Sequence, residues 1–367
     1  MADFMTQAGL AVRARCIRRL ALSLAFALLA FATPSAAATF NYFPTPIDVS
    51  PVVAGAWTDV DVSANVPVGA TGVIVQFLGV GADADYGVRM KGSTDNWAFD
   101  EEAKAGQSGW LMTGVNAARV FQVYTGDAAV RTYLVGYTMA GVKFFVNRID
   151  KSTATTGTWV DVNIAAETGS DTAIGAIFHV DCQAGSSVGY GLRKQGSTDN
   201  RLQTLRANMM NLGLVGVDTT ETAQQQIAAT TVDLFLVGYV TSGAVFFTNA
   251  VDKSTAITGS YQPVDITNDV GAGVANGAFV EIQPSDGTRR NTAIRPNGAT
   301  YDYYGEVSHQ FALVGIDAGD VFEQKIQLNT MDLYLTGYSL ADGAGTFRVK
   351  SGSYTGTICG EDASQVF

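Results

Sequence analysis

The most constraining feature of this chain is a sequence pattern that occurs three times, at a spacing of 102 residues. The run Trp-Thr-Asp-Val-Asp-Val begins at Trp57, and related runs begin at Trp159 and Tyr261. A second run, with the pattern aromatic-Leu-x-Gly-Tyr, occurs once in each copy. Repeats of this kind define the unit that folds. They also allow each candidate site to be compared between copies.

The copies, of about 100 residues each, have the alternating pattern of β-strands. Runs such as 72–77, 119–124 and 142–146 are short and rich in β-branched and aromatic residues. The 40 glycines of the chain, with many Ser, Thr, Asp and Asn, separate these runs as turns require. We therefore expect an all-β fold of three tandem antiparallel β-sandwich repeats, of jelly-roll or immunoglobulin-like type. The strand order within each repeat stays open.

The segments that join the copies are also repeated. Residues 144–152 return as 246–254, and related segments lie at 47–50 and 346–351. They contain no flexible linker, which predicts a stiff array or a compact pseudo-threefold body. A terminal segment could add to the sheet edge of another copy and build a homo-oligomer or polymer. The predicted organisation is a signal peptide at 1–38, β-sandwich repeats at 39–142, 143–244 and 245–346, and a C-terminal strand and tail at 347–367.

Residues 1–38 have the layout of a secretory signal peptide. Four arginines precede an apolar run at 20–32, and small residues follow at 34–38. The apolar run is too short for a stable membrane span. We expect cleavage and export, so the mature protein is predicted to be secreted, extracellular or at the cell surface.

The charge of the chain narrows the range of partners. The formal net charge is −11, and removal of 1–38, with four Arg and one Asp, makes it −14. An acidic protein repels a phosphate backbone, so nucleic acid is excluded as a partner. No later stretch is long and apolar enough to predict a membrane span in the mature chain.

Cysteine use is sparse. Cys16 leaves with the signal peptide, and Cys182 and Cys359 remain. Export permits a disulfide between them, but they do not correspond in the repeat frame, which favours two unpaired buried thiols. Neither a CxxC spacing nor a histidine cluster is present in the sequence, so we expect no zinc or redox site and no cofactor.

The two histidines of the chain are candidates for acid–base chemistry. His179 aligns with Gln76 and Glu281, whereas His309 aligns with a serine and a methionine in the other copies. Neither accompanies a repeated Ser, Cys or acid, so a Ser–His–Asp triad has little support. We expect a structural role for both, and no catalytic residue is predicted.

An arginine is repeated in all three copies, as Arg89, Arg193 and Arg295. A guanidinium group binds a carboxylate through two parallel hydrogen bonds. These residues are therefore candidate sites for an anion or an acidic glycan. The alternative, which we favour, is a structural ion pair with the repeated turn position that holds Asn116, Asp218 or Asp317.

A Gly-Ser-Thr-Asp-Asn turn at 92–96 and 196–200 is the second repeated polar feature. Trp97 follows the first turn, and the looser third copy contains Tyr301. Polar groups beside an aromatic ring suit sugar binding, although the same residues are ordinary turn formers. The candidate ligand-binding residues are therefore Arg89, Arg193, Arg295, Asp95, Asn96, Trp97, Asp199, Asn200 and Tyr301.

Acidic residues give weaker signals. Asp83 and Asp85 lie in a glycine-rich loop, but their spacing does not match the twelve-residue calcium loop of EF-hands. A solvated acidic loop is the favoured interpretation, and we predict no metal site. A carboxylate pair for glycoside hydrolysis stays open, because no pair of acids is repeated through the three copies.

We therefore expect an exported, non-enzymatic extracellular or cell-surface protein with a structural, adhesive or assembly role. Its partners would be an extracellular glycan or a surface protein. The alternative is a multivalent carbohydrate-binding protein, in which three weak sites gain avidity by linkage. A third hypothesis is a secreted hydrolase that uses carboxylates.

Overall fold

The computed structural model describes residues 38–341, apart from 80, 82 and 98–101. The described residues belong to one compact unit. Residues 1–37 of the predicted signal peptide, the strand and tail at 347–367, and Cys359 lie outside the described residues. The described part is all-β, as predicted: its strands form six four-stranded antiparallel sheets.

The strands are divided here into three groups of eight that follow one another along the chain. The first group contains β1 (Phe40–Asp48), β2 (Trp57–Asp61), β3 (Gly72–Gly79), β4 (Ala84–Met90), β5 (Glu102–Ala103), β6 (Ser108–Gly114), β7 (Val120–Thr125) and β8 (Val130–Thr138). The second contains β9 (Val142–Asp150), β10 (Val160–Asn163), β11 (Gly175–Cys182), β12 (Val188–Lys194), β13 (Gln203–Leu205), β14 (Met209–Gly216), β15 (Thr222–Ile227) and β16 (Val232–Val240). The third contains β17 (Ala244–Asp252), β18 (Gln262–Asp265), β19 (Ala275–Pro284), β20 (Arg290–Pro296), β21 (Gly305–Val307), β22 (Gln310–Gly315), β23 (Val321–Ile326) and β24 (Met331–Leu340). Two helices of four residues each, α2 (Ala165–Thr168) and α3 (Thr267–Val270), follow β10 and β18.

The strand order is the same in all three groups. One sheet of each group joins its first, eighth, third and sixth strands, as in β1-β8-β3-β6, β9-β16-β11-β14 and β17-β24-β19-β22. The other sheet joins the second, seventh, fourth and fifth strands, as in β2-β7-β4-β5. The repeated sequence pattern therefore specifies one pairing scheme three times.

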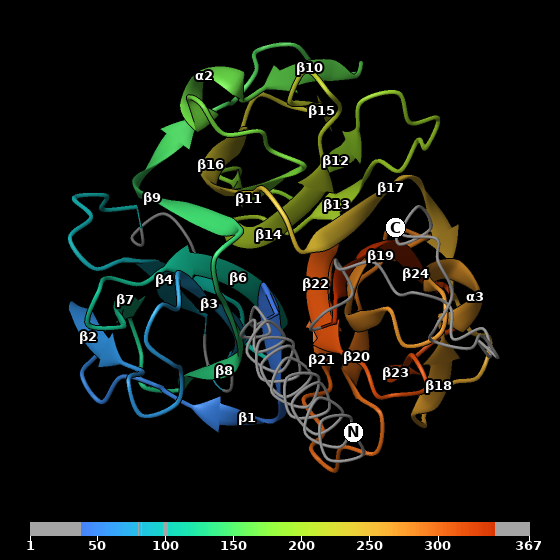
Figure 1. The fold of residues 1–367 in the computed structure, drawn as a ribbon, viewed down its shortest axis with the longest axis horizontal. Coiled ribbons are helices and arrows are strands. Elements are labelled where there is room, and N and C mark those ends of the chain that lie inside the picture. The colour runs from blue at the N-terminus through green and yellow to red at the C-terminus, as the bar shows by residue number, and fades with distance from the viewer. Residues whose placement is uncertain (1–37, 80, 82, 98–101, 342–367) are drawn as a thin grey trace, which may run out of the picture. The chain divides into compact units, whose positions relative to one another are not determined.

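The six sheets are arranged as a propeller-like ring rather than as three clearly separate sandwiches, as Figure 1 shows. The expected all-β fold of antiparallel sheets is confirmed, whereas three distinct tandem sandwich repeats are not clearly seen. The physical reason is that β6, β14 and β22, which are edge strands of their sheets, contact one another at the centre. Their apolar side chains therefore leave water together rather than within separate cores.

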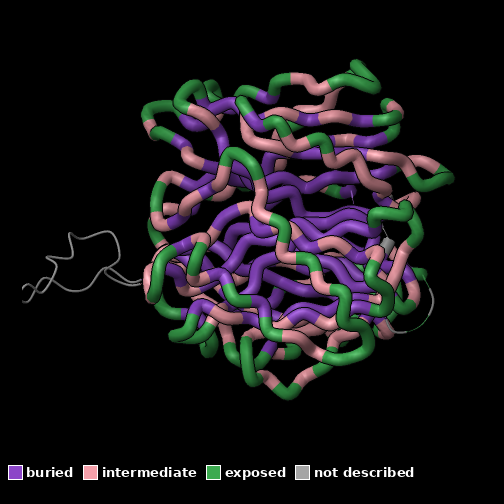
Figure 2. Tube along the Cα trace, turned by 90° about the vertical axis from the view of Figure 1, so that its right-hand side faces the viewer, coloured by how far each residue is buried: buried purple, intermediate pink, exposed green. Residues whose placement is uncertain are grey.

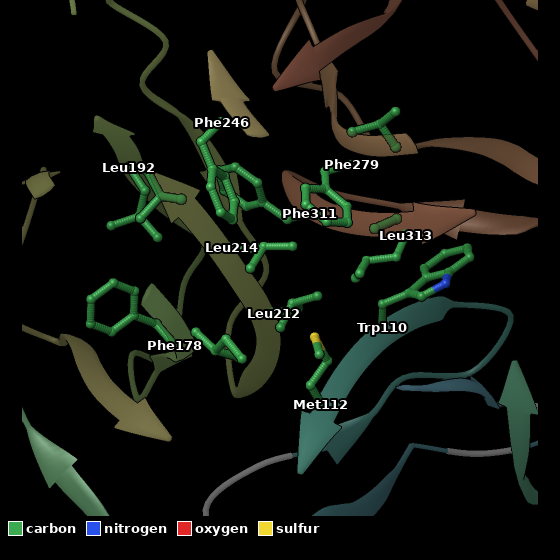
Figure 3. Close-up of a cluster of buried hydrophobic side chains, with 14 of the residues drawn as sticks. Trp110, Met112, Phe178, Leu192, Leu212, Leu214, Phe246, Phe279, Phe311 and Leu313 are labelled. Carbon is green, nitrogen blue, oxygen red and sulfur yellow. The ribbon is translucent and has the colours of Figure 1, made fainter. Parts of the chain in front are cut away.

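Equivalent residues of these three strands form the central core. One layer contains Trp110, Leu212 and Phe311, and the next contains Met112, Leu214 and Leu313; all six are buried, and Figure 3 shows them converging. A single apolar cluster consequently contains residues of all three groups. Figure 2 shows buried segments through the interior of the unit, with exposed residues concentrated in the connecting turns.

Each group also inserts an aromatic side chain from its first strand over a pair of glycines of the preceding group. Phe246 of β17 lies over Gly175 and Gly216, so closely that a Cβ atom at Gly175 would lie 2.3 Å from its ring. Phe144 of β9 does the same over Gly72 and Gly114, and Tyr42 of β1 lies over Gly277 and Gly315. We call the contact made by Phe144, between the first and second groups, the first junction. The contact made by Phe246, between the second and third groups, is the second junction, and the contact made by Tyr42, between the third and first groups, is the third junction. The segments expected to join the repeats are therefore the strands that dock each group on its neighbour.

We predict that Gly175→Ala destabilises the protein by roughly 1–3 kcal/mol, because the added methyl group would overlap the Phe246 ring. Gly185→Ala is the matched control, since a Cβ atom there meets nothing within 4 Å. It should change the free energy of unfolding by less than about 0.5 kcal/mol. Urea unfolding would measure both, and equal effects of the two variants would contradict the role of the glycine pair.

Candidate functional site

The three repeated arginines lie on equivalent strands and stack on equivalent aromatic rings. The guanidinium carbons of Arg89 and Arg193 lie 4.0 Å from the ring centroids of Trp57 and Trp159. The third, Arg295, lies 3.5 Å from the centroid of the Tyr261 ring. A cation over an aromatic face is attracted by the negative charge density of the ring. The sequence landmark at which each copy begins is therefore the partner of the repeated arginine.

Hydrogen bonds occupy the edges of the same guanidinium groups. The Nε atoms donate to side-chain oxygens of the seventh strand of each group: Gln122 (2.9 Å), Gln224 (2.8 Å) and Glu323 (2.6 Å). The Nη1 atoms donate to backbone carbonyl oxygens of the following turn, at Asp95, Asp199 and Tyr301. We call each arginine, with its ring and these two acceptors, an arginine cluster. Its chemistry is that of a structural joint between strands and a turn.

The predicted ion pair with Asn116, Asp218 or Asp317 is wrong. These side chains cap the turn in which they lie; for example, Asp218 Oδ1 accepts hydrogen bonds from the backbone N–H groups of Thr220 and Thr222 (2.9 and 3.0 Å). The residues that sequence reasoning missed, Gln122 and its equivalents, recur in the same frame as the arginine. A search for polar residues at the repeat spacing would have found two of the three as glutamines.

The predicted turn residues complete the arginine clusters. Asn96 Oδ1 accepts a hydrogen bond from Trp57 Nε1 (3.1 Å), and Asn200 Oδ1 accepts one from Trp159 Nε1 (3.0 Å). In the third group Asp302 has this role toward the Tyr261 hydroxyl (3.0 Å). The amide and carboxylate groups expected to contact a ligand are thus bonded to the protein itself.

The rest of the turn fastens each group to the next at the first two junctions. Asn147 Oδ1 accepts hydrogen bonds from the Ser93 hydroxyl (3.0 Å) and the Thr94 N–H (2.9 Å). The carboxylate of Asp95 accepts one from the Arg148 N–H (2.7 Å). We call this set of contacts the latch. At the second junction it is formed by the equivalent residues Ser197, Thr198, Asp199, Asn249 and Ala250, with distances of 2.8–2.9 Å.

The third junction has different residues at the latch positions. Thr45 replaces the asparagine of the strand, and Pro46, which has no N–H group, replaces the donor to the aspartate. On the turn, Ala299 replaces the serine and Tyr301 replaces the aspartate. The changes on the two sides match: the serine hydroxyl is lost with its asparagine acceptor, and the aspartate acceptor is lost with its N–H donor.

The residue that follows the turn makes a chemically different contact at each junction. Trp97 packs edge-on against His179, with their ring centroids 5.6 Å apart. At the second junction Arg201 forms an ion pair with the fully buried Glu281 (2.7 Å). At the third, Tyr303 stacks on Tyr133, with centroids 4.3 Å apart. These pairs give each junction its own complementary chemistry.

Trp97 is not an open platform for a sugar ring. It is 7 % exposed, and its ring is packed edge-on by Trp57 with a centroid distance of 5.8 Å. The guanidinium carbon of Arg148 lies 4.5 Å from its centroid. Tyr301, the other predicted stacking residue, is partly buried and contacts Tyr303, with centroids 5.1 Å apart.

The two histidines are both buried at junctions, with different surroundings. His179 Nε2 lies 2.9 Å from the carbonyl oxygen of Met112. Burial lowers the pKa of His179 to about 3, against a smaller raising effect of that hydrogen bond, so the ring is neutral. His309 instead lies between two acceptors, the Tyr190 carbonyl (3.0 Å from Nδ1) and Glu281 Oε1 (2.7 Å from Nε2).

Glu281 joins this histidine to the ion pair of the second junction. Burial favours the neutral acid, but the hydrogen bond and charge of His309 and the contacts of Arg201 hold the pKa of Glu281 below its ordinary value. The carboxylate is therefore charged and bonded on both oxygens. A buried charge that is paired in this way fixes the positions of its neighbours.

The acidic loop and the remaining cysteine also have structural surroundings. Asp83 forms an ion pair with Lys104 (3.3 Å) and accepts a hydrogen bond from the Ala105 N–H (2.9 Å). Among the residues that the structure describes, no group of three or more His, Cys, Asp or Glu is placed to hold a metal ion. Cys182 is buried as a free thiol. None of the helices searched, all within the described range, is long and apolar enough to cross a membrane.

Comparisons with known proteins give little guidance. No protein-family model and no curated protein matches the chain. One similar solved structure comes from Sulfolobus Turreted Icosahedral Virus, with 12% identity over 83% of this chain and 92% of that chain and a TM-score of 0.21. Another is the N-terminal CBM22-1-CBM22-2 tandem domain of Xyn10C from Paenibacillus barcinonensis, with 9% identity over 57% of this chain and 100% of that chain and a TM-score of 0.17. At these TM-scores neither likeness carries an argument about function.

We predict that Asn147→Ala lowers the free energy of unfolding by roughly 1–2 kcal/mol, because the Ser93 hydroxyl and Thr94 N–H lose their shared acceptor. Thr45→Ala, at the equivalent position of the third junction, is the matched control and should stay within about 0.5 kcal/mol of the unchanged protein. Denaturant unfolding of both would test this. Equal losses would show that the latch contributes nothing specific.

We also predict that His179 makes the fold sensitive to acid. Its folded pKa of about 3 lies below the ordinary value of 6.5, so its contribution to stability is complete above pH 6.5 and falls as the pH drops toward 3. The unchanged protein should lose stability between pH 7 and pH 4. In His179→Gln, which copies Gln76 of the first group, this loss should be smaller by roughly 2–3 kcal/mol. Urea unfolding at several pH values measures this, and an unchanged acid dependence would contradict it.

Proposed function

We propose that this protein is an exported, non-enzymatic structural or assembly protein of the cell surface or extracellular space. The observation that carries the proposal is the use of the repeated polar residues. In the arginine clusters and latches, the repeated polar side chains form hydrogen bonds within the protein. Their repetition therefore supports a stiff body rather than three copies of a ligand site.

The strand order supports a finer description of the fold. Two four-stranded sheets, ordered first-eighth-third-sixth and second-seventh-fourth-fifth, have the pairing of a jelly roll. We therefore propose three jelly-roll sandwiches that share a central core. Of the two types that the sequence leaves open, this order favours the jelly roll over the immunoglobulin-like sandwich.

The geometry of the junctions favours a stiff body. Each junction combines an aromatic ring over two glycines with a pair that only its own neighbour complements, such as Arg201 with Glu281. Rigid units of this kind suit a role in which loops on a fixed body meet other molecules. Export rests on the predicted signal peptide at 1–38, which lies outside the described residues.

Carbohydrate binding is the hypothesis that this proposal displaces. The expected sugar platform, Trp97, is buried, and the amide groups of Asn96 and Asn200 bond to indole nitrogens. A sugar at these turns would have to replace those hydrogen bonds rather than add to them.

The proposal is tested with the purified mature protein on a glycan array and on a panel of polysaccharides. We expect no glycan signal at micromolar protein and no release of reducing sugar, because the repeated polar groups are already bonded. As a control, Trp57→Ala should lower the thermal stability and leave the array unchanged. Glycan binding that Trp57→Ala abolishes, or turnover that a single Asp or Glu replacement abolishes, would overturn the proposal.

A further inference from the structure

The third junction contains a cleft of about 420 Å³ beside Tyr42. The repeated cavities at the first and second junctions, lined in part by Arg148 and Arg201, measure about 20 Å³ each, and their counterpart at the third junction, lined in part by Tyr301, measures about 10 Å³. The cleft lies beside this counterpart and shares Tyr42, Phe43, Pro296 and Gly315 with it. The volume of the cleft lies within the range of ordinary ligand pockets. The cleft is therefore an additional feature of the third junction, beside the small cavity that all three junctions have.

One lining position of the cleft differs between the three junctions. At the second junction the side chain of Lys194 covers Gly216, where a Cβ atom would lie 3.0 Å from its Cδ. At the first, Met90 covers Gly114 in the same way, with its sulfur 2.9 Å from such an atom. The third group has Pro296 at this position, and the three atoms nearest to a Cβ atom at Gly315 all belong to Tyr42.

The cleft is held open by the rest of the ring. The first and second junctions fix the third group relative to the first group through their latches and glycine pairs. The third junction therefore needs no latch of its own to stay in register. A site held in this way loses little conformational freedom when it binds a segment.

The lining of the cleft defines the chemistry of its occupant. Three aromatic rings, two prolines and two asparagine amides line it, and the lining residues that the structure describes are all uncharged. The amide of Asn276 already donates to the Phe40 carbonyl (2.7 Å) and accepts from Ser339 (2.6 Å). The hydroxyl groups of a sugar would find few free partners here, whereas apolar side chains of an extended peptide would not need them.

The chain itself supplies such a peptide close to the cleft. The last strand, β24, ends with Leu340 paired to Ala275, and the Ala341 N–H donates to the Val274 carbonyl (2.9 Å). Asn276, two residues further along β19, lines the cleft. Residues 342–367 continue from this point and lie outside the described residues.

The sequence of that continuation resembles the strands that dock neighbouring groups, and because Tyr42 of β1 already covers the glycine pair of the third group, the continuation would lie beside β1. At the first two junctions, the segment that follows the eighth strand of a group, namely β9 or β17, is the one that covers its glycine pair. The segment that follows β24 contains a related run at 346–351, in which Phe347 and Val349 alternate with Arg348 and Lys350. This alternation gives an extended segment one apolar face and one charged face. Phe347 is the sixth residue after Ala341, so an extended chain between them would span roughly 20 Å.

We propose that the cleft at the third junction is the docking site of the C-terminal segment of the same chain, with Phe347 and Val349 against Tyr42, Phe43 and Pro296. The segment takes the space that Met90 and Lys194 fill at the other junctions. The inference concerns this junction alone and does not depend on the proposed function of the protein.

Binding of a separate peptide tests the proposal. A fluorescein-labelled peptide of residues 342–367, with Cys359→Ser, is titrated with protein that ends at Ala341, and anisotropy is measured. We expect binding to this protein and at least about tenfold weaker binding to the full chain, whose own tail competes within the molecule. No binding to the shortened protein, or equal binding to both, would overturn the proposal.

Two variants locate the site. Pro296→Lys, which copies Lys194, should fill the cleft and abolish peptide binding by the shortened protein. Phe145→Ala, the equivalent of Phe43 at the first junction, is the matched control and should leave binding within about twofold. Binding that persists in Pro296→Lys would place the peptide elsewhere and contradict the proposal.

Trypsin digestion of the full chain gives an independent test that needs no shortened protein. Docking should protect the bonds after Arg348 and Lys350, so Pro296→Lys should raise their cleavage rate by about tenfold or more, as read by mass spectrometry. Circular dichroism confirms that the variant is folded. Equal cleavage rates in the two proteins would contradict docking.

Discussion

The contact on which this structure depends is an aromatic ring of one strand group pressed over two glycines of the preceding group. Each group supplies one ring and one glycine pair, so the interface is head-to-tail. Head-to-tail contacts either continue without limit or close into a ring. Here they close after three groups, and closure brings β6, β14 and β22 together to form the shared core. Glycine is required because any side chain would occupy the volume of the ring, as the 2.3 Å separation at Gly175 shows.

The repeated polar residues secure this arrangement. Arg193, for example, combines stacking on Trp159 with hydrogen bonds to Gln224 and to the turn at Asp199, so one guanidinium joins three strands and a turn. Planar, delocalised charge suits this use, because its face and its edges can be satisfied at the same time. A repeated arginine is thus evidence of a repeated joint as readily as of a repeated binding site.

The junctions are alike in backbone and different in chemistry. An exchange of neighbours would place the buried carboxylate of Glu281 opposite Trp97 or Tyr303, without the Arg201 charge that it needs. An unpaired buried charge costs several kcal/mol. The pairs therefore determine which group follows which, in addition to the order that the chain imposes. The third junction, whose two groups are not consecutive in the chain, is the one where the contacts have diverged most, at Thr45 and Tyr301.

Much of the architecture could be predicted from the sequence, because strand periodicity and turn residues are local properties. The alternation of apolar residues and the recurrence of Trp57, Trp159 and Tyr261 sufficed to predict an all-β chain built on three copies of one pattern. The same frame correctly set Arg89 and the Gly-Ser-Thr-Asp-Asn turn apart from the histidines as repeated polar features. It did not give their partners, since Arg89 contacts Gln122 rather than the turn residue Asn116.

What only the tertiary structure decided is which surfaces meet. The latch between Asn147 and the turn at Ser93, the glycine pairs and the cleft at the third junction all depend on residues far apart in the sequence. Alternation assigns a side chain to a face of a sheet but does not say what covers that face. By itself the sequence determined that one β unit is used three times. The packing of three such units around a common core decided that they form a closed ring, because each unit buries its apolar edge most completely against the other two.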